Sequence, residues 1–244
     1  MALEMGRLRA VFFDAFGTLL DARGLHLEAT EIILAELGLS KWVSAEELHK
    51  RWDEHIMASW RAGRFLRTWD VFTISLEKAL QDFGVNVRPG ELRVAEVVLL
   101  NTFSKTRLYD GARELLAFCR SLGLRTGIIS DADAALLRSL LRKHGLTDLL
   151  DTAVISDEVG ALKPDPRVFE KALKAVGCEP QEALMVGDAR RDVEGAKKTG
   201  MWAALVLHTG GELSELALEP DIIVNSLAEL RGPIATLSGL YDKL

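Results

Sequence analysis

An apolar run from Ala10 to Phe13 ends directly in the carboxylate of Asp14 and in a turn that contains Gly17. Four consecutive apolar residues bounded by turn residues are typical of a buried strand. Open α/β sheets bind their ligands outside the carboxyl ends of parallel strands, so Asp14 is a candidate functional residue. A strand followed by an ordinary Asp-containing turn would have the same pattern. This stretch alone therefore leaves a turn and an active site equally open.

The length of 244 residues suits one large domain or a core with a smaller insertion. The net charge is −6 and no basic stripe stands out, so we expect no nucleic-acid partner. The longest apolar stretches are too short to span a bilayer, and residues 1–9 lack the features of a secretory signal. Cys119 and Cys178 both lie in expected helices, which argues against a disulfide framework or a Cys-based zinc site. We therefore expect a cytoplasmic protein with no membrane partner.

Residues 21–106 are expected to form a separate small domain of four helices, inserted after the first strand. Apolar residues at helical spacing predict these helices. Their starts are indicated by a capping box at Ser44, a possible cap at Thr68 and a first-turn proline at Pro89. Their expected ranges are Leu27–Leu37, Ala45 to about Gly63, Thr68–Phe83 and Pro89–Ser104. An aromatic stripe at helical spacing is more typical of a core than of a binding surface. Four tryptophans belong to this stripe: Trp42, Trp52, Trp60 and Trp69.

From Leu108 onward, short apolar runs alternate with helical patterns. The expected strands are Arg125–Ile129, Thr152–Ile155, Ala183–Val186, Ala203–Leu207 and Ile222–Val224. Such alternation predicts right-handed βαβ crossovers and a parallel sheet. The predicted fold is therefore α/β, with a Rossmann-like parallel sheet core flanked by helices. Residues 1–20 and 107–244 form this core, and residues 21–106 form the inserted helical domain.

Polar side chains stand where four of these segments end. They are Asp14, Ser130 with Asp131, Lys163, and Asp188 with Asp192. Alone, each could be a helix cap, a turn residue or a solvated surface charge. In a parallel sheet, however, these ends share one edge, and the set suits metal-assisted attack on phosphorus. Asp14 and Asp188 offer oxygens to Mg²⁺, Ser130 can donate to a phosphoryl oxygen, and Lys163 balances negative charge.

Four short segments, in order and spacing, resemble the motifs of the haloacid dehalogenase-like hydrolase superfamily. They are Asp14-Ala15-Phe16-Gly17-Thr18-Leu19, Ile128-Ile129-Ser130-Asp131, Lys163-Pro164-Asp165-Pro166 and Gly187-Asp188-Ala189-Arg190-Arg191-Asp192. The resemblance covers essentially the whole chain, with residues 21–106 in the position of a type-1 helical cap. It implies a hydrolase that forms a covalent intermediate on Asp14.

The resemblance also implies a role for each site residue. The expected catalytic residues are Asp14, Ser130 and Lys163. The expected substrate-binding residues are Thr18, Ser130, Asp131 and Lys163. The expected Mg²⁺ ligands are Asp14, the backbone carbonyl of Phe16, and Asp188, with Asp192 in the second shell or orienting a metal-bound water. The implied substrate is a small phosphorylated metabolite.

Phe16 departs from the phosphatase pattern of this superfamily, in which a second Asp two residues after the nucleophile acts as general acid and base. A phenyl ring cannot transfer a proton, and loss of such a group costs about 10²–10⁴-fold in rate. Dehalogenases of the superfamily have an aromatic residue there, but their fourth motif typically has Ser and Asn where this chain has Asp188. Without a cation, Asp188 would repel an anionic haloacid. We therefore favour a Mg²⁺-dependent phosphatase that forms an aspartyl-phosphate on Asp14.

Two alternatives stay open: a 2-haloacid dehalogenase-type hydrolase, and a weakly catalytic or non-catalytic phosphate-binding regulatory protein. Cap residues set specificity in this superfamily, and we identify no ligand motif in residues 21–106. Arg61, Arg64 and Arg67 either meet an anionic substrate or form a solvated loop. The sequence defines neither the particular substrate nor the oligomeric state.

Overall fold

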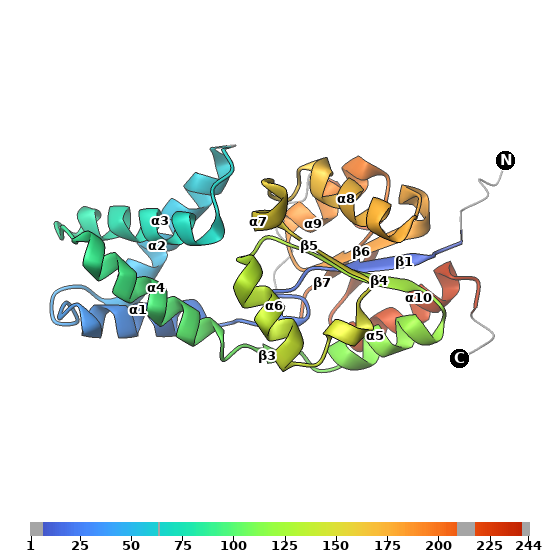
Figure 1. Ribbon diagram of the computed structural model, residues 1–244, viewed down its shortest axis with the longest axis horizontal. Coiled ribbons are helices and arrows are strands. Elements are labelled where there is room, and N and C mark those ends of the chain that lie inside the picture. Colours follow the sequence, from blue (N-terminus) through green and yellow to red (C-terminus); the bar gives the residue numbers. More distant parts are fainter. Residues whose placement is uncertain (1–6, 63, 209–217, 241–244) are drawn as a thin grey trace. The chain divides into compact units, whose positions relative to one another are not determined.

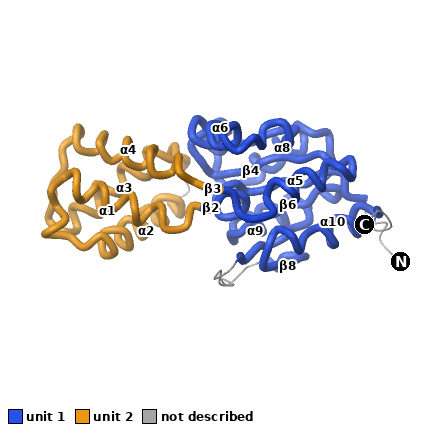
Figure 2. The backbone as a smooth tube through the Cα atoms, turned by 90° about the horizontal axis from the view of Figure 1, so that it is seen from below, with its two compact units in different colours: residues 1–21, 108–244 blue, residues 22–107 orange. Residues whose placement is uncertain are grey.

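The computed structural model describes residues 7–62, 64–208 and 218–240. The chain forms two compact units, which Figure 2 distinguishes by colour. Unit 1 comprises residues 1–21 and 108–244, and unit 2 comprises residues 22–107.

Unit 1 is built on a six-stranded sheet in which all paired strands run parallel, in the order β5-β4-β1-β6-β7-β8. The strands are β1 (Ala10–Phe13), β4 (Arg125–Ser130), β5 (Thr152–Ile155), β6 (Ala183–Gly187), β7 (Trp202–Val206) and β8 (Ile222–Val224). Strand β1 lies between β4 and β6, and all four of its residues are buried. A strand with neighbours on both sides and covered faces reads as a continuous apolar run. This sheet confirms the predicted parallel α/β core.

Helices cover both faces of the sheet. Figure 1 shows α8 (Pro166–Val176) and α9 (Arg190–Thr199) on one face, and α5 (Ala112–Ser121) and α10 (Arg231–Leu237) on the other. Among the described residues, unit 1 also contains α6 (Ala134–Lys143) and the short α7 (Ser156–Val159). The core beneath α8 and α9 includes the large side chains Phe12, Phe169 and Met185.

Several short elements were not predicted from the sequence. They are α7, α10, the strand pair β2 (Leu20–Asp21) and β3 (Arg107–Leu108), and three single 3₁₀ turns at Thr147–Leu149, Pro180–Glu182 and Leu227–Leu230. Segments this short contain too few residues to establish a hydrophobic period. Ser130 is the last residue of β4 and does not cap a helix. Helix α6 is capped by Asp133, whose Oδ1 accepts a hydrogen bond from the Leu136 N–H at 2.7 Å.

Unit 2 contains four helices, as predicted: α1 (Leu25–Glu36), α2 (Ala45–Arg61), α3 (Thr68–Asp82) and α4 (Pro89–Phe103). The cap predicted at Ser44 is present, because its hydroxyl accepts from the Glu47 N–H. The cap predicted at Thr68 is wrong, because Thr68 is the first helical residue and Arg67 occupies the cap position, where its side chain accepts no capping hydrogen bond. In the described residues, no helix has both the length and the apolar character needed to cross a membrane.

Three of the four tryptophans of unit 2 belong to its core. Trp52 is fully buried, and its Nε1–H donates to the Phe72 carbonyl at 2.8 Å. Trp60 and Trp69 are partly buried against the same cluster. Trp42 is 83% exposed, so the prediction that it belongs to the core is wrong. It lies between α1 and α2, where helical spacing no longer determines which residues point inward.

We expect Trp52→Ala to lower the free energy of unfolding by about 3–5 kcal/mol, because it leaves a large cavity and removes the hydrogen bond to the Phe72 carbonyl. Urea denaturation followed by far-ultraviolet circular dichroism measures the change. Trp42→Ala is the matched control and should change stability by no more than about 0.5 kcal/mol. Equal losses in the two variants would contradict the assignment of Trp52 to the core.

Candidate active site

The carboxyl ends of the central strands bring four acidic and two basic side chains of unit 1 together. They are Asp14, Asp131, Asp188, Asp192, Lys163 and Arg191. Asp14 directly follows β1, and its backbone N–H donates to the Val186 carbonyl at 2.9 Å, which continues the pairing with β6. One carboxylate oxygen each from Asp14, Asp188 and Asp192 lie within 4.8 Å of one another. The convergence expected from the strand ends is therefore observed for these residues.

Lys163 is the centre of this cluster. Its Nζ lies 2.9 Å from Asp14 Oδ1 and 2.5 Å from Asp192 Oδ1, and it donates to the Ile129 carbonyl at 3.1 Å. The side chain has no exposed area. Burial opposes the charged ammonium, but the neighbouring carboxylates outweigh burial and raise the pKa of Lys163. Lys163 therefore stays positively charged and cannot serve as a general base.

Asp14 is buried and firmly oriented. Its Oδ1 accepts from the Ala15 N–H at 2.7 Å in addition to facing Lys163. Two donors on one oxygen fix the plane of the carboxylate. A carboxylate held in this way would lose little conformational freedom in a reaction.

Asp188 is solvent-accessible and is held by Thr18, whose Oγ1–H donates to Asp188 Oδ1 at 2.8 Å. Thr18 was expected to bind substrate, but its single hydroxyl proton is used to orient Asp188. Gly17 has φ of +89°, and a methyl group at this position would collide with the Asp188 carboxylate. Glycine is thus required here both for the backbone conformation and for the close approach of Asp188.

Asp192 is buried, and both of its oxygens are engaged. Oδ1 pairs with Lys163, and Oδ2 accepts from the Ala189 N–H at 3.0 Å. Burial, together with the charges of Asp14 and Asp188, raises the pKa of Asp192 to about 7 despite the favourable charge of Lys163. A side chain at Gly187 would collide with Asp192. These contacts suit a supporting position for Asp192, not a direct metal ligand.

Asp131 was expected to contact substrate, but both of its carboxylate oxygens face neighbouring residues of the site. Its Oδ1 accepts from the Lys163 backbone N–H at 3.0 Å, and its Oδ2 lies 3.3 Å from Arg191 Nε. Burial raises the pKa of Asp131 despite these two cations. No role was predicted for Arg191 from the sequence. Its neighbour Arg190 pairs with Glu194 on α9, and composition alone could not tell which of two adjacent arginines turns inward.

Ser130 is 2% exposed, and within the described residues its hydroxyl has no hydrogen-bond partner. Buried hydroxyls normally have partners, so an unpaired one calls for an explanation. An oxygen of a bound ligand would accept this proton. The arrangement therefore suits the phosphoryl-binding role expected for Ser130.

The charges of the cluster do not balance. Four carboxylates face two cations, so the fully ionised cluster carries two net negative charges. Desolvation raises the pKa of Asp188, and the nearby charge of Asp14 raises it further. A divalent cation would neutralise it, and carboxylate oxygens are the ligands that Mg²⁺ prefers. The residues present therefore fit a Mg²⁺ ion.

The three arginines singled out in unit 2 are exposed. Arg67 Nε lies 3.3 Å from Asp70 Oδ2, one turn along the chain in α3. Arg61 ends α2, and Arg64 follows it in the connection to α3. Within unit 2 these positions fit the solvated loop that the sequence analysis left open.

Comparisons with known proteins agree with this geometry. Residues 8–200 match the family model of haloacid dehalogenase-like hydrolases. An (S)-2-haloacid dehalogenase from a Pseudomonas species is 32% identical over 198 residues, which cover 80% of this chain and 83% of the relative. A glyceraldehyde 3-phosphate phosphatase from Methanothermobacter thermautotrophicus is 32% identical over 213 residues, which cover 85% of this chain and 88% of the relative.

A solved structure of a dehalogenase with an intermediate complex has the same fold. Its TM-score is 0.75 at 25% sequence identity, and the match covers 93% of this chain and 97% of that one. Similarity therefore extends to proteins that cleave carbon–halogen bonds and to proteins that cleave phosphate esters. Because the family model matches most of the sequence, this chain belongs to the haloacid dehalogenase-like hydrolases.

Proposed function

We propose that this hydrolase is a Mg²⁺-dependent phosphatase that acts on a small phosphorylated metabolite through an aspartyl-phosphate on Asp14. The observation that carries the proposal is the Asp188 carboxylate, which Thr18 holds beside Asp14. Without a cation, this carboxylate would repel an anionic substrate that approaches Asp14. With a divalent cation, the same carboxylate becomes a ligand. The phosphatase from Methanothermobacter thermautotrophicus supports this choice.

In this proposal, oxygens of Asp14 and Asp188 and the backbone carbonyl of Phe16 would hold Mg²⁺, with waters completing its shell. When bound, the ion supplies positive charge that offsets the charge of the phosphoryl group and of the two carboxylates. Asp192 does not bind the ion directly in this scheme. It holds Lys163 in place and closes the first turn of α9.

The reaction has two steps. First, a carboxylate oxygen of Asp14 attacks phosphorus, the bond from phosphorus to the ester oxygen breaks, and the alcohol leaves after taking a proton from water. Second, a water attacks phosphorus and gives one proton to the solvent, which supplied a proton in the first step; the bond from phosphorus to Asp14 breaks, and inorganic phosphate leaves with the carboxylate restored. Ser130 donates to a phosphoryl oxygen, and Lys163 keeps Asp14 oriented and offsets negative charge.

Phe16 and the Pseudomonas relative favour a second candidate, a 2-haloacid dehalogenase. In that reaction Asp14 would attack the carbon that bears the halogen, halide would leave, and water would hydrolyse the resulting ester. The aromatic residue two positions after Asp14 is the feature of this chain that resembles dehalogenases. The charge of Asp188 argues against the dehalogenase, because it would repel an anionic haloacid.

The deciding experiment measures phosphate release from p-nitrophenyl phosphate with and without Mg²⁺. We expect activity that depends on Mg²⁺ and falls by at least about 10³-fold in Asp14→Asn, which lacks the nucleophilic carboxylate. Asp148→Asn is the matched control, because Asp148 is an exposed carboxylate in the 3₁₀ turn Thr147–Leu149 of unit 1. This control should keep full activity.

Halide release from 2-haloacids without metal would overturn the phosphatase in favour of the dehalogenase. Phosphate binding that depends on Ser130, without turnover of any phosphoester, would instead favour a regulatory protein. A screen of phosphoesters that differ in their leaving groups extends the same measurement to the substrate.

Gly17→Ala is predicted to weaken Mg²⁺ binding by about 10–100-fold, because the added methyl group displaces Asp188. Isothermal titration calorimetry measures the affinity. Gly24→Ala is the matched control: Gly24 has a similar φ of +75°, but a methyl group there meets nothing within 4 Å. Both variants should lose about 1 kcal/mol of stability from backbone strain. Equal Mg²⁺ affinity in the two would argue against Asp188 as a ligand.

Phe16→Asp is predicted to raise turnover of alkyl phosphates, by up to about 10²-fold, and to change p-nitrophenyl phosphate turnover much less. The reason is that an alkoxide needs a proton to leave, whereas p-nitrophenolate does not. In the wild type, aryl and acyl phosphates should therefore react faster than alkyl phosphates, with hydrolysis of the intermediate limiting the fast substrates. Steady-state kinetics on matched alkyl and aryl esters, with burst analysis, measures both effects.

Equal rates on alkyl and aryl esters, unchanged by Phe16→Asp, would mean that another residue supplies the proton. Asp131 would then be tested before Asp133. Its pKa is raised, whereas the Asp133 carboxylate is used as a helix cap.

A further inference from the structure

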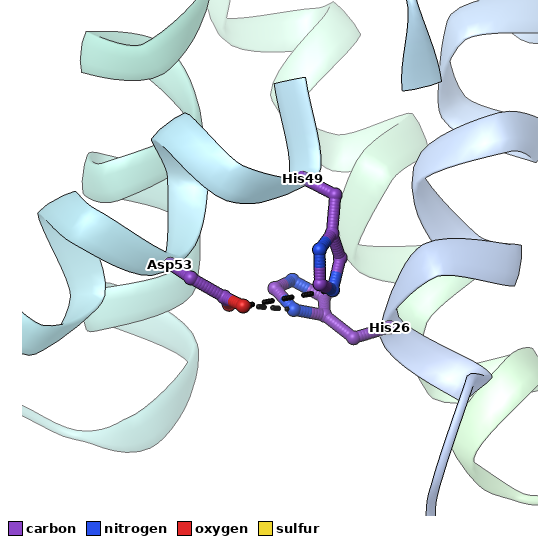
Figure 3. Close-up of side chains that lie close together, drawn as sticks. All are labelled: His26, His49 and Asp53. Carbon is purple, nitrogen blue, oxygen red and sulfur yellow. Dashed lines mark ion pairs between the residues drawn. The ribbon is translucent and has the colours of Figure 1, made fainter. Parts of the chain in front are cut away.

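Unit 2 contains a second cluster of metal-ligand side chains, separate from the acidic site of unit 1. It consists of His26, His49 and Asp53, drawn in Figure 3. We propose that these three residues bind a divalent transition-metal ion of the Zn²⁺ type. None of them takes part in the proposed phosphatase reaction.

The three side chains come from two helices. His26 lies in the first turn of α1, and His49 and Asp53 lie one turn apart on α2, so that they share one face of that helix. In Figure 3 both imidazole rings point toward the Asp53 carboxylate. Two imidazoles and one carboxylate form a ligand set that is typical of zinc and neighbouring first-row metals, with a water in the remaining position.

The distances match such a site. His26 Nδ1 lies 3.0 Å from Asp53 Oδ1, and His49 Nε2 lies 3.6 Å from Asp53 Oδ2. In a tetrahedral zinc site with bonds of about 2.0–2.1 Å, neighbouring ligand atoms are about 3.3 Å apart. One ligand atom from each of the three residues already lies within 4.8 Å of the other two. Small side-chain rotations would therefore complete the coordination.

Packing holds the His26 ring in place before any ion binds. Its centroid lies 4.4 Å from the Trp52 ring, 5.5 Å from Phe72 and 4.8 Å from His49. The side chains are 16% exposed for His26, 28% for His49 and 43% for Asp53. Aromatic rings therefore pack against His26, whereas the Asp53 carboxylate is accessible to solvent. An ion with a bound water can enter without unfolding the unit.

A simple hydrogen-bonded network explains the cluster less well. The 3.6 Å between His49 and Asp53 is longer than a hydrogen bond. Elsewhere on α2, His55 makes an ordinary contact of 2.9 Å with Asp82, and among the described residues it belongs to no group of three metal-ligand side chains. Of the two imidazoles that face Asp53, only that of His26 therefore lies within hydrogen-bond distance of its carboxylate.

Metal binding here would tie the start of α1 to the middle of α2. His26 lies four positions after Ala22, the first residue of unit 2. The helix-to-helix link would therefore stabilise unit 2 close to the point where the chain enters it. The ion would act on structure, since none of its ligands belongs to the acidic site.

Calorimetric titration of the full-length, metal-free protein with Zn²⁺, in the presence of excess Mg²⁺, tests the proposal. Mg²⁺ prefers oxygen ligands and occupies the acidic site, which isolates the imidazole site. We expect one Zn²⁺ per chain, bound at least about tenfold more weakly by His49→Ala and by Asp53→Asn. His55→Ala is the matched control: it removes a histidine of the same helix with the same 28% exposure, and it should bind Zn²⁺ like the wild type.

Co²⁺ provides a second readout, because its visible absorption reports nitrogen ligands and coordination number directly. The wild type and Asp188→Asn should give the same Co²⁺ spectrum, so the result is independent of the proposed phosphatase. Circular dichroism checks that each variant is folded, and Asp53→Asn preserves shape if His49→Ala does not fold. Absence of Zn²⁺ binding, or equal affinity in His49→Ala, Asp53→Asn and the wild type, would overturn the proposal.

Discussion

The acidic site depends on one buried ammonium group. Lys163 contacts Asp14 and Asp192 directly, its backbone N–H binds Asp131, and its charge acts on Asp188. A buried, unpaired lysine would lose its proton, and three buried carboxylates without a cation would repel one another. Each charge is therefore stable only in the presence of the others. The parallel sheet makes this possible by bringing the ends of β1, β4 and β6 to one edge.

Most of the fold could be predicted from the sequence because its signals are local. The apolar run of β1, the alternation that follows Leu108 and the four helical periods of unit 2 each extend over enough residues to show a period. The short elements could not be predicted, and neither could the exposure of Trp42, because loop geometry depends on distant contacts. The cluster of His26, His49 and Asp53 was not predicted either, because it also depends on contacts between residues that are distant in the sequence. Only the packing of α1 against α2 brings His26 to the other two.

Within the acidic site, residue types indicated the chemistry but not the partner of each side chain. The carboxylates, Ser130 and Lys163 stand where the strand ends predict. The hydroxyl of Thr18, however, orients Asp188, and Asp131 binds the backbone of Lys163. A sequence gives a list of donors and acceptors, and only the folded chain decides how they pair. The contrast between Phe16 and Asp188 is different, because both are visible in the sequence and carry opposite chemical implications.

The paired strands β2 and β3 have a consequence for folding. The chain leaves unit 1 through β2 and returns through β3, and these two segments hydrogen-bond to each other. Once unit 2 has folded, the ends of the insertion are already side by side. The entropy lost when β1 joins β4 is then that of closing a short loop, even though the strands are more than a hundred residues apart in the sequence. The insertion therefore lengthens the chain but adds little to the entropy that is lost when the parallel sheet forms.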